Sequence, residues 1–172
     1  FAPGTANPAQ FRPGVVRRFH PLTLNLKALQ TVYLGKPQAL TLHLPLDTGP
    51  GFDLELVPST VLASDFKVQA ARGGYTAYQP GLYFHGVVKG EPNSTATISV
   101  FQDEVYGIIT TSTGVYNLGK PEDPKGDQKF SPTEYVLVKQ TDFLVPNPNQ
   151  CHTPAPENFQ MPALPKYSTL QP

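Results

Sequence analysis

A single cysteine, Cys151, has the strongest potential for chemistry in this chain. It lies beside His152 in a proline-rich stretch, NPNQCHTPAP, that covers residues 147–156. One thiol cannot close a disulfide within the chain. Cys151 is therefore a chance unpaired cysteine, one half of a disulfide with another chain, or a thiolate that binds a metal of a partner protein. A thiolate on the open position of a catalytic zinc displaces the water that must attack substrate.

Other pairs of reactive residues point to enzymes, each with a simpler structural explanation. A Cys151–His152 nucleophilic pair is disfavoured, because neighbours on an extended chain point apart. Asp53 and Glu55 share one face of a predicted strand, as paired carboxylates for glycoside hydrolysis require, but alternating charges also mark a solvated face. The histidines His20, His43 and His85 lack the spacing of a zinc-protease helix.

Tyrosines supply one candidate binding surface. Tyr75, Tyr78 and Tyr83 lie close in sequence and could form an aromatic platform for sugars, although tyrosines near the start of a strand more often cap the edge of a core. No complete metal site is visible within the sequence, so we expect no cofactor of the chain's own.

Charge and hydropathy exclude several partners. Thirteen basic residues balance thirteen acidic ones over 172 residues, and no basic stripe is present, which argues against nucleic acid. No apolar run approaches the ~18 residues of a membrane span. The chain opens on Phe1-Ala2-Pro3-Gly4 without a signal peptide, and we expect secretion with the signal already removed. Asn93-Ser94-Thr95 is a candidate glycosylation sequon at Asn93.

Alternation of apolar and polar residues dominates the chain and predicts an all-β domain. Twenty prolines and fourteen glycines favour short strands and many turns. Period-two patterns occur at residues 22–26, 40–46, 52–56 and 66–70, each with one apolar face directed inward, and consecutive hairpins follow over 82–118 with a last strand at 134–139. We expect a mainly antiparallel β-sandwich or an open barrel of hairpins.

Three regions complete this organisation. Residues 1–14 are predicted as an irregular arm, 15–145 as the β domain, and 146–172 as an extended Pro-rich tail that carries Cys151. At most one short helix is expected, near 26–34. There Leu26, Leu29 and Tyr33 fall at helical spacing, with Ala28 and Val32 on the same side.

One stretch resembles a known family. Residues 81–101, GLYFHGVVKGEPNSTATISVF, are similar to the prodomains of secreted zinc metallopeptidases of the reprolysin (adamalysin) type. The shared pattern is an aromatic residue, then Gly-x-Val-x-Gly-x-Pro-x-Ser, then a strand of alternating small residues. The segments VYGII (105–109) and GVYNL (114–118) match the next two strands, and the likeness extends more weakly from residue 40 to 120.

The resemblance implies a prodomain without its protease. In that family a prodomain cysteine ligates the catalytic zinc, and Cys151 is the residue here that could match, although it precedes His152 rather than the usual glycine. We therefore expect a non-catalytic propeptide that keeps a cognate zinc metallopeptidase latent, with Cys151 on the partner's zinc, and that assists its folding. The alternative is an extracellular β-sandwich module that binds carbohydrate or protein.

Overall fold

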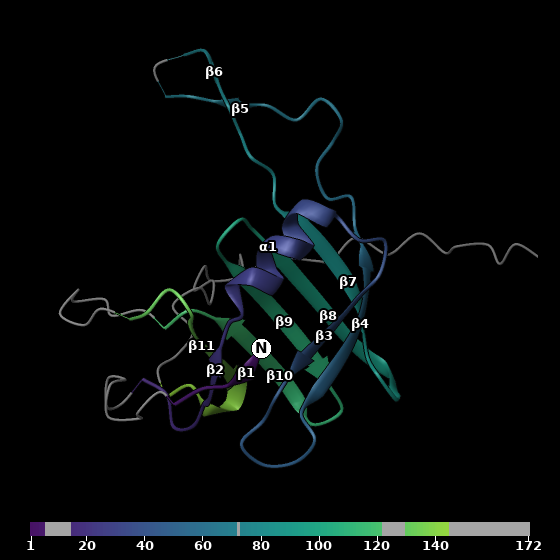
Figure 1. The fold of residues 1–172 in the computed structure, drawn as a ribbon, viewed down its shortest axis with the longest axis vertical. Coiled ribbons are helices and arrows are strands. Elements are labelled where there is room, and N and C mark those ends of the chain that lie inside the picture. Colours follow the sequence, from purple (N-terminus) through teal and green to yellow (C-terminus); the bar gives the residue numbers. More distant parts are fainter. Residues whose placement is uncertain (6–14, 72, 122–129, 145–172) are drawn as a thin grey trace, which may run out of the picture.

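A single antiparallel sheet forms the body of the molecule. The computed structural model describes residues 1–5, 15–71, 73–121 and 130–144. Within these ranges nine strands hydrogen-bond in the order β1-β2-β11-β10-β9-β8-β7-β4-β3, and the sheet curves until its two edges face each other (Figure 1). The predicted all-β class is confirmed, and the form is an open barrel.

Most predicted strands are present. In chain order the elements are β1 (Ala2–Pro3), β2 (His20–Thr23), α1 (Leu26–Gly35), β3 (Leu40–Leu44), β4 (Phe52–Pro58), β5 (Val68–Gln69), β6 (Tyr75–Thr76), β7 (Leu82–Val88), β8 (Glu91–Val100), β9 (Val105–Thr111), β10 (Gly114–Gly119), β11 (Glu134–Lys139) and the 3-10 turn η2 (Gln140–Asp142). β7 to β10 form the expected meander. Residues 2 and 3 depart from the predicted irregular arm, because they pair with β2 as a short edge strand.

Inward-facing side chains from every part of the sheet fill one core. Leu54, Ile98, Ile109 and Leu137 are fully buried on four different strands. Phe52 on β4 and Tyr116 on β10 meet edge to face, with ring centroids 5.0 Å apart, although three strands separate β4 from β10 in the sheet. This contact therefore crosses the barrel interior.

The barrel is open between its edge strands β1 and β3, and two features join β2 to β3 across this opening. Asp47, which follows β3, donates its backbone N–H to Nδ1 of His20 on β2 at 3.3 Å. α1 connects the two strands and contributes buried Leu29 to the core, with Leu26, Val32 and Tyr33 packed beside it. The predicted helix is confirmed, but Ala28 is exposed, so its placement on the packed side was wrong.

The β7–β8 hairpin explains the glycines and the serine of residues 86–94. Gly86 pairs with Leu56 at a point where an added Cβ would overlap the carbonyl oxygen of Glu55, so only glycine lets β7 approach β4. Gly90 turns the chain with a φ of 81°. The register then shifts, because Gly86 pairs with Ala96 while Val88 pairs with Glu91, which leaves a bulge in β8.

Ser94 completes this bulge from within. Its side chain is buried, and its hydroxyl accepts the backbone N–H of Val88 at 2.7 Å while donating to the carbonyl of Glu91 at 2.6 Å. The hydroxyl thus replaces the backbone partner that the bulge removes from Val88. Glycine and serine are needed here for the shape of the hairpin itself.

Residues 60–80 leave the barrel as a projecting hairpin, of which all but residue 72 are described. Figure 1 shows β5 and β6 extending well beyond the end of the sheet. The predicted strand over 66–70 shrinks to Val68–Gln69, and its apolar face does not point into the core. Phe66 keeps 47% of its surface exposed, because this segment pairs only with β6 and not with the barrel.

Candidate binding site on the projecting hairpin

The residues first considered for chemistry do not converge. Cys151 and its neighbour His152 lie outside the described residues. His43 on β3 and Asp53 on β4 form an ion pair on the outer face, with Nδ1 and Oδ1 2.7 Å apart and about half of each side chain exposed. Glu55 shares that exposed face, so the carboxylates do lie together as predicted, but on an open convex surface of the sheet.

Asn93 lies in the bulge of β8, and its side chain is exposed. The sequon is therefore accessible on the folded surface, while the middle residue of the tripeptide, Ser94, is buried. Glycosylation at Asn93 stays a prediction.

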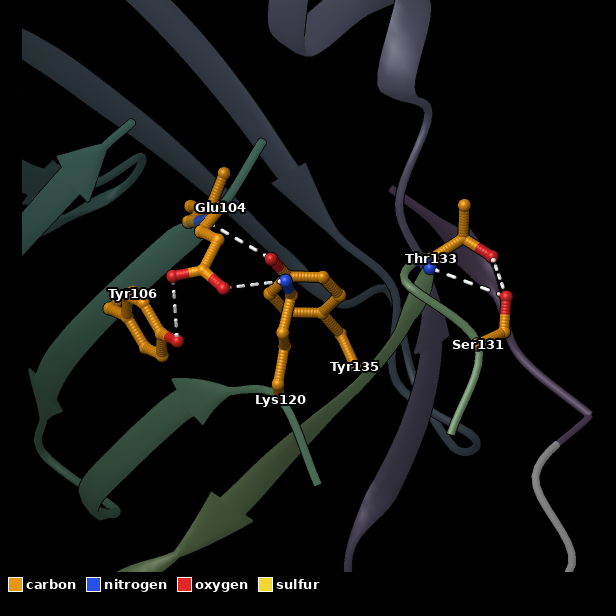
Figure 2. A network of polar contacts seen from close by, with 7 residues as sticks. Glu104, Tyr106, Lys120, Ser131, Thr133 and Tyr135 are labelled. Carbon is orange, nitrogen blue, oxygen red and sulfur yellow. Dashed lines mark hydrogen bonds and ion pairs between the residues drawn. The ribbon is translucent and has the colours of Figure 1, made fainter. Parts of the chain in front are cut away.

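A second cluster of ionisable groups lies where the β8–β9 turn meets the end of β10. Lys120 Nζ donates to Oε1 of Glu104 at 2.7 Å, and the hydroxyl of Tyr106 donates to Oε2 of the same carboxylate at 3.1 Å. Figure 2 shows these side chains pointing toward one another beside Tyr135, whose hydroxyl accepts the backbone N–H of Val105 at 3.1 Å. The cluster therefore joins β9, β10 and β11.

Electrostatics in this cluster are those of a structural network. The hydrogen bond from Lys120 holds the pKa of Glu104 below its ordinary value. Burial is the largest single effect on the pKa of Lys120 and lowers it, but the hydrogen bond to Glu104 and the charges of Tyr135, Glu104 and Asp103 together outweigh it, so the net shift is upward. Burial raises the pKa of Tyr135. Glu104 and Lys120 are thus stabilised in their charged forms and Tyr135 in its neutral form, which are the ordinary states of these groups at neutral pH.

The projecting hairpin holds an open pocket that brings together several of the candidate residues. The pocket has a volume of about 410 Å³ and is lined by Leu62, Ala63, Phe66, Lys67, Val68, Tyr75, Thr76, Tyr78 and Pro80. This volume falls within the ~300–1,000 Å³ typical of ligand sites. Two of the three tyrosines proposed from sequence, Tyr75 and Tyr78, line it.

Aromatic contacts hold the pocket wall in place. The rings of Phe66 and Tyr78 meet edge to face at 5.4 Å, and the hydroxyl of Tyr78 lies 3.4 Å from that of Tyr83 on β7. That hydrogen bond, followed by burial, raises the pKa of Tyr83. Tyr33 on α1 donates its hydroxyl to the carbonyl of Pro80 at 3.3 Å, which anchors the end of the hairpin. The hairpin is thereby tied to both the sheet and the helix.

The aromatic row continues onto the outer face of the sheet. Tyr83 contacts Phe101 at 6.3 Å between ring centroids, and Phe101 contacts Tyr106 at 6.5 Å. Neighbouring planes in the row cross at 63° to 90°. The rings of this row therefore form a rough, angular surface, and a sugar platform made by Tyr75, Tyr78 and Tyr83 stays a prediction.

Sequence reasoning found the tyrosines but missed Phe66 and Lys67. Both were assigned to a strand with an inward apolar face, and both are exposed on the projecting hairpin. One signal in the sequence could have placed them: the pair Gly73-Gly74, inside the segment between Pro58 and Pro80, favours a tight turn, and in the structure both glycines have positive φ at the tip of the hairpin.

Among the residues that the structure describes, no group of three or more His, Cys, Asp or Glu side chains is arranged to hold a metal ion. No helix in the described ranges has the length and apolar character needed to cross a membrane. A comparison with protein-family models gave no match, and a search of curated proteins gave none either.

Proposed function

We propose that the chain is the pro-region of a zinc metallopeptidase of the reprolysin type. Its β domain docks on the catalytic domain and assists its folding, and Cys151 in the tail supplies a thiolate to the catalytic zinc. The zinc belongs to the partner, so the chain needs no metal of its own. A thiolate in that position displaces the attacking water and keeps the enzyme latent.

One observation carries this proposal. The residues that carry the resemblance to reprolysin-type prodomains all lie in the bulged β7–β8 hairpin: Gly86, Val88, Gly90, Pro92 and Ser94. At positions 86, 90 and 94 a specific steric or hydrogen-bonding requirement of the hairpin explains why the residue is Gly, Gly or Ser. A pattern with this much structural content supports common architecture better than a similarity of composition does.

Tethering explains how a single cysteine could suffice. A thiolate on a chain attached to the enzyme has an effective concentration of about millimolar, so even a weak zinc ligand occupies the site. An extended segment also suits a protease cleft, which binds substrate as an added strand. Cleavage between pro-region and enzyme removes the tether, and dilution then favours release.

Inhibition of a purified reprolysin-type catalytic domain tests the proposal. The chain is titrated against that domain with a fluorogenic peptide substrate, beside the variants Cys151→Ser and Thr97→Ala. Thr97 is exposed on β8 and serves as the matched control. We expect inhibition by the chain and by the control, and inhibition at least about tenfold weaker with Cys151→Ser.

A cobalt-substituted catalytic domain gives an independent signal. Binding of the chain should produce a thiolate-to-cobalt charge-transfer band, and Cys151→Ser should abolish it. Equal inhibition by Cys151→Ser and by the unaltered chain would contradict the zinc–thiolate part while leaving docking intact. No inhibition by the unaltered chain would contradict the pro-region itself.

Extracellular binding of carbohydrate or protein is the second candidate function, and the pocket of the projecting hairpin favours it. Exposed aromatic rings around an open pocket are typical of binding surfaces. On a glycan array, a sugar-binding module should give signals that Tyr75→Ala removes and Cys151→Ser does not change.

Secretion from a eukaryotic host should in addition yield glycan at Asn93, detected as a mass shift that Asn93→Gln removes.

A further inference from the structure

The pocket of the projecting hairpin combines apolar walls with one positive charge. Tyr75, Phe66 and Tyr78 keep 73%, 47% and 42% of their surfaces exposed, an unusual concentration of bare aromatic area on one short segment. Lys67 is the sole ionised side chain among the lining residues, and its ammonium lies 5.2 Å from the centre of the Tyr75 ring. The site therefore offers an apolar recess with a cation at its rim.

The recess is held in a defined shape before any ligand arrives. Within the hairpin, Ala70 accepts the N–H of Gly73 at 2.9 Å and donates to Gly74 at 3.0 Å. At the base, the contacts of Tyr78 with Tyr83 and of Pro80 with Tyr33 fix the hairpin to the barrel. A preorganised site loses little conformational entropy on binding, which favours affinity for a small ligand segment.

The angle between the aromatic rings favours a peptide over a carbohydrate as the ligand of this pocket. A sugar chain stacks on successive ring faces that lie in one plane, whereas Phe66 and Tyr78 stand at 63° to each other. Rings inclined at this angle instead form two walls of a recess, into which one bulky apolar side chain fits. Tyrosine anchors of this kind are also characteristic of the centres of protein interfaces.

The positive charge of Lys67 at the rim favours a ligand that carries an acidic residue next to its apolar side chain. No acidic residue lines the pocket, so a ligand carboxylate near Lys67 meets attraction without a competing acid from the lining. We propose that the pocket binds an extended peptide segment of a partner protein, with one large apolar side chain in the recess and an acidic residue beside it paired with Lys67. The inference rests on the proposed function, since it supplies the docking surface that a pro-region requires.

Blocked heptapeptides titrated into the ¹⁵N-labelled chain test this site, with binding followed by amide chemical shifts. The first peptide carries a central leucine between two glutamates, the second a leucine between two lysines, and the third a serine between two glutamates. A neutral β-1,4-linked glucose hexamer is the fourth probe. We expect saturable shifts within the projecting hairpin for the first peptide, binding about fivefold weaker for the second, and none for the third or the hexamer.

Charge reversal at the rim gives the sharper test. Lys67→Glu should invert the order of the first two peptides, and Lys89→Glu, on an exposed turn at the other end of β7, should leave the order unchanged. Tyr78→Ala should abolish binding of both, with unchanged shifts across the sheet showing that the barrel remains folded.

Several results would overturn the inference. Absence of binding by the first peptide, equal binding by the serine peptide, or an order that Lys67→Glu does not invert would each reject the proposed recognition. Binding of the glucose hexamer in place of the peptides would assign the pocket to carbohydrate. Inhibition of a catalytic domain by Tyr78→Ala as strong as that by the unaltered chain, together with failed peptide binding, would remove this site while leaving the pro-region proposal standing.

Discussion

Replacing Ser94 by alanine should reveal how strongly the bulged hairpin depends on one hydroxyl. The side chain is 2% exposed, so water cannot readily take its place. Its removal leaves the N–H of Val88 without an acceptor and the carbonyl of Glu91 without a donor. A buried polar group left unsatisfied costs about 1–3 kcal/mol, and the orphaned N–H has no second route to a partner.

The two losses together should lower the free energy of unfolding by about 3 kcal/mol. That is a large part of the ~5–15 kcal/mol that holds a typical domain together. For a chain of this length each kcal/mol lowers the melting temperature by about 2–4 °C, so we expect a decrease of about 6–12 °C.

Urea unfolding followed by far-ultraviolet circular dichroism provides the measurement, since the chain has no tryptophan to report by fluorescence. Thr97→Ala, on the exposed face of the same strand, is the control and should change the free energy by less than about 0.5 kcal/mol. A loss below about 1 kcal/mol for Ser94→Ala would mean that the bulge relaxes or admits water, and the account of Ser94 as a substitute backbone partner would be wrong.

Three further predictions concern the barrel. Gly86→Ala should push β7 away from β4 and destabilise the fold severely in thermal unfolding, whereas Gly35→Ala, with open space around it, should be neutral within about 0.5 kcal/mol. Burial raises the pKa of Tyr135 in the folded state. The stability that this phenol contributes is therefore complete below its unfolded pKa of ~10 and declines as the pH rises from there toward the folded pKa. Tyr135→Phe should flatten this alkaline decline of the unfolding free energy, measured by chemical denaturation. The pKa of Glu104 is lowered chiefly by Lys120, so the stability contributed by this carboxylate is present above pH ~4.3 and is lost as the pH falls toward the folded pKa. Glu104→Gln should therefore reduce the loss of unfolding free energy between about pH 5 and 3. The reduction should be less than ~1 kcal/mol, because both side chains of the pair are partly exposed.

Local patterns predicted the elements of the fold better than their arrangement. The alternation at residues 96–100 and 105–111 identified strands because each places Ile98 or Ile109 in the core and polar neighbours in water. Leu26, Leu29 and Tyr33 likewise identified α1. The pairing of β2 with β11 could not be read from sequence, since nothing local in His20–Thr23 specifies a partner more than a hundred positions away.

The candidate site was only half predictable, for a different physical reason. Tyr75 and Tyr78 were noticed because aromatic residues near turns are conspicuous. Phe66 and Val68 follow the same alternation as true core strands, so periodicity assigned them an inward face. Whether such a face is buried depends on a neighbouring strand to cover it, and β5 has only the two-residue β6.

The pairing of β2 with β11 also has a consequence for how the chain reaches its native state. His20 lies opposite Leu137, so β2 has to wait for a partner strand that is synthesised more than a hundred residues later. Closing so long a loop is slow, whereas the tightly connected β7–β10 meander can assemble from nearest neighbours. The leucines of β2 and α1 therefore stay exposed to solvent on the ribosome until β11 has been synthesised, and in that interval they are the segment that a chaperone would shield.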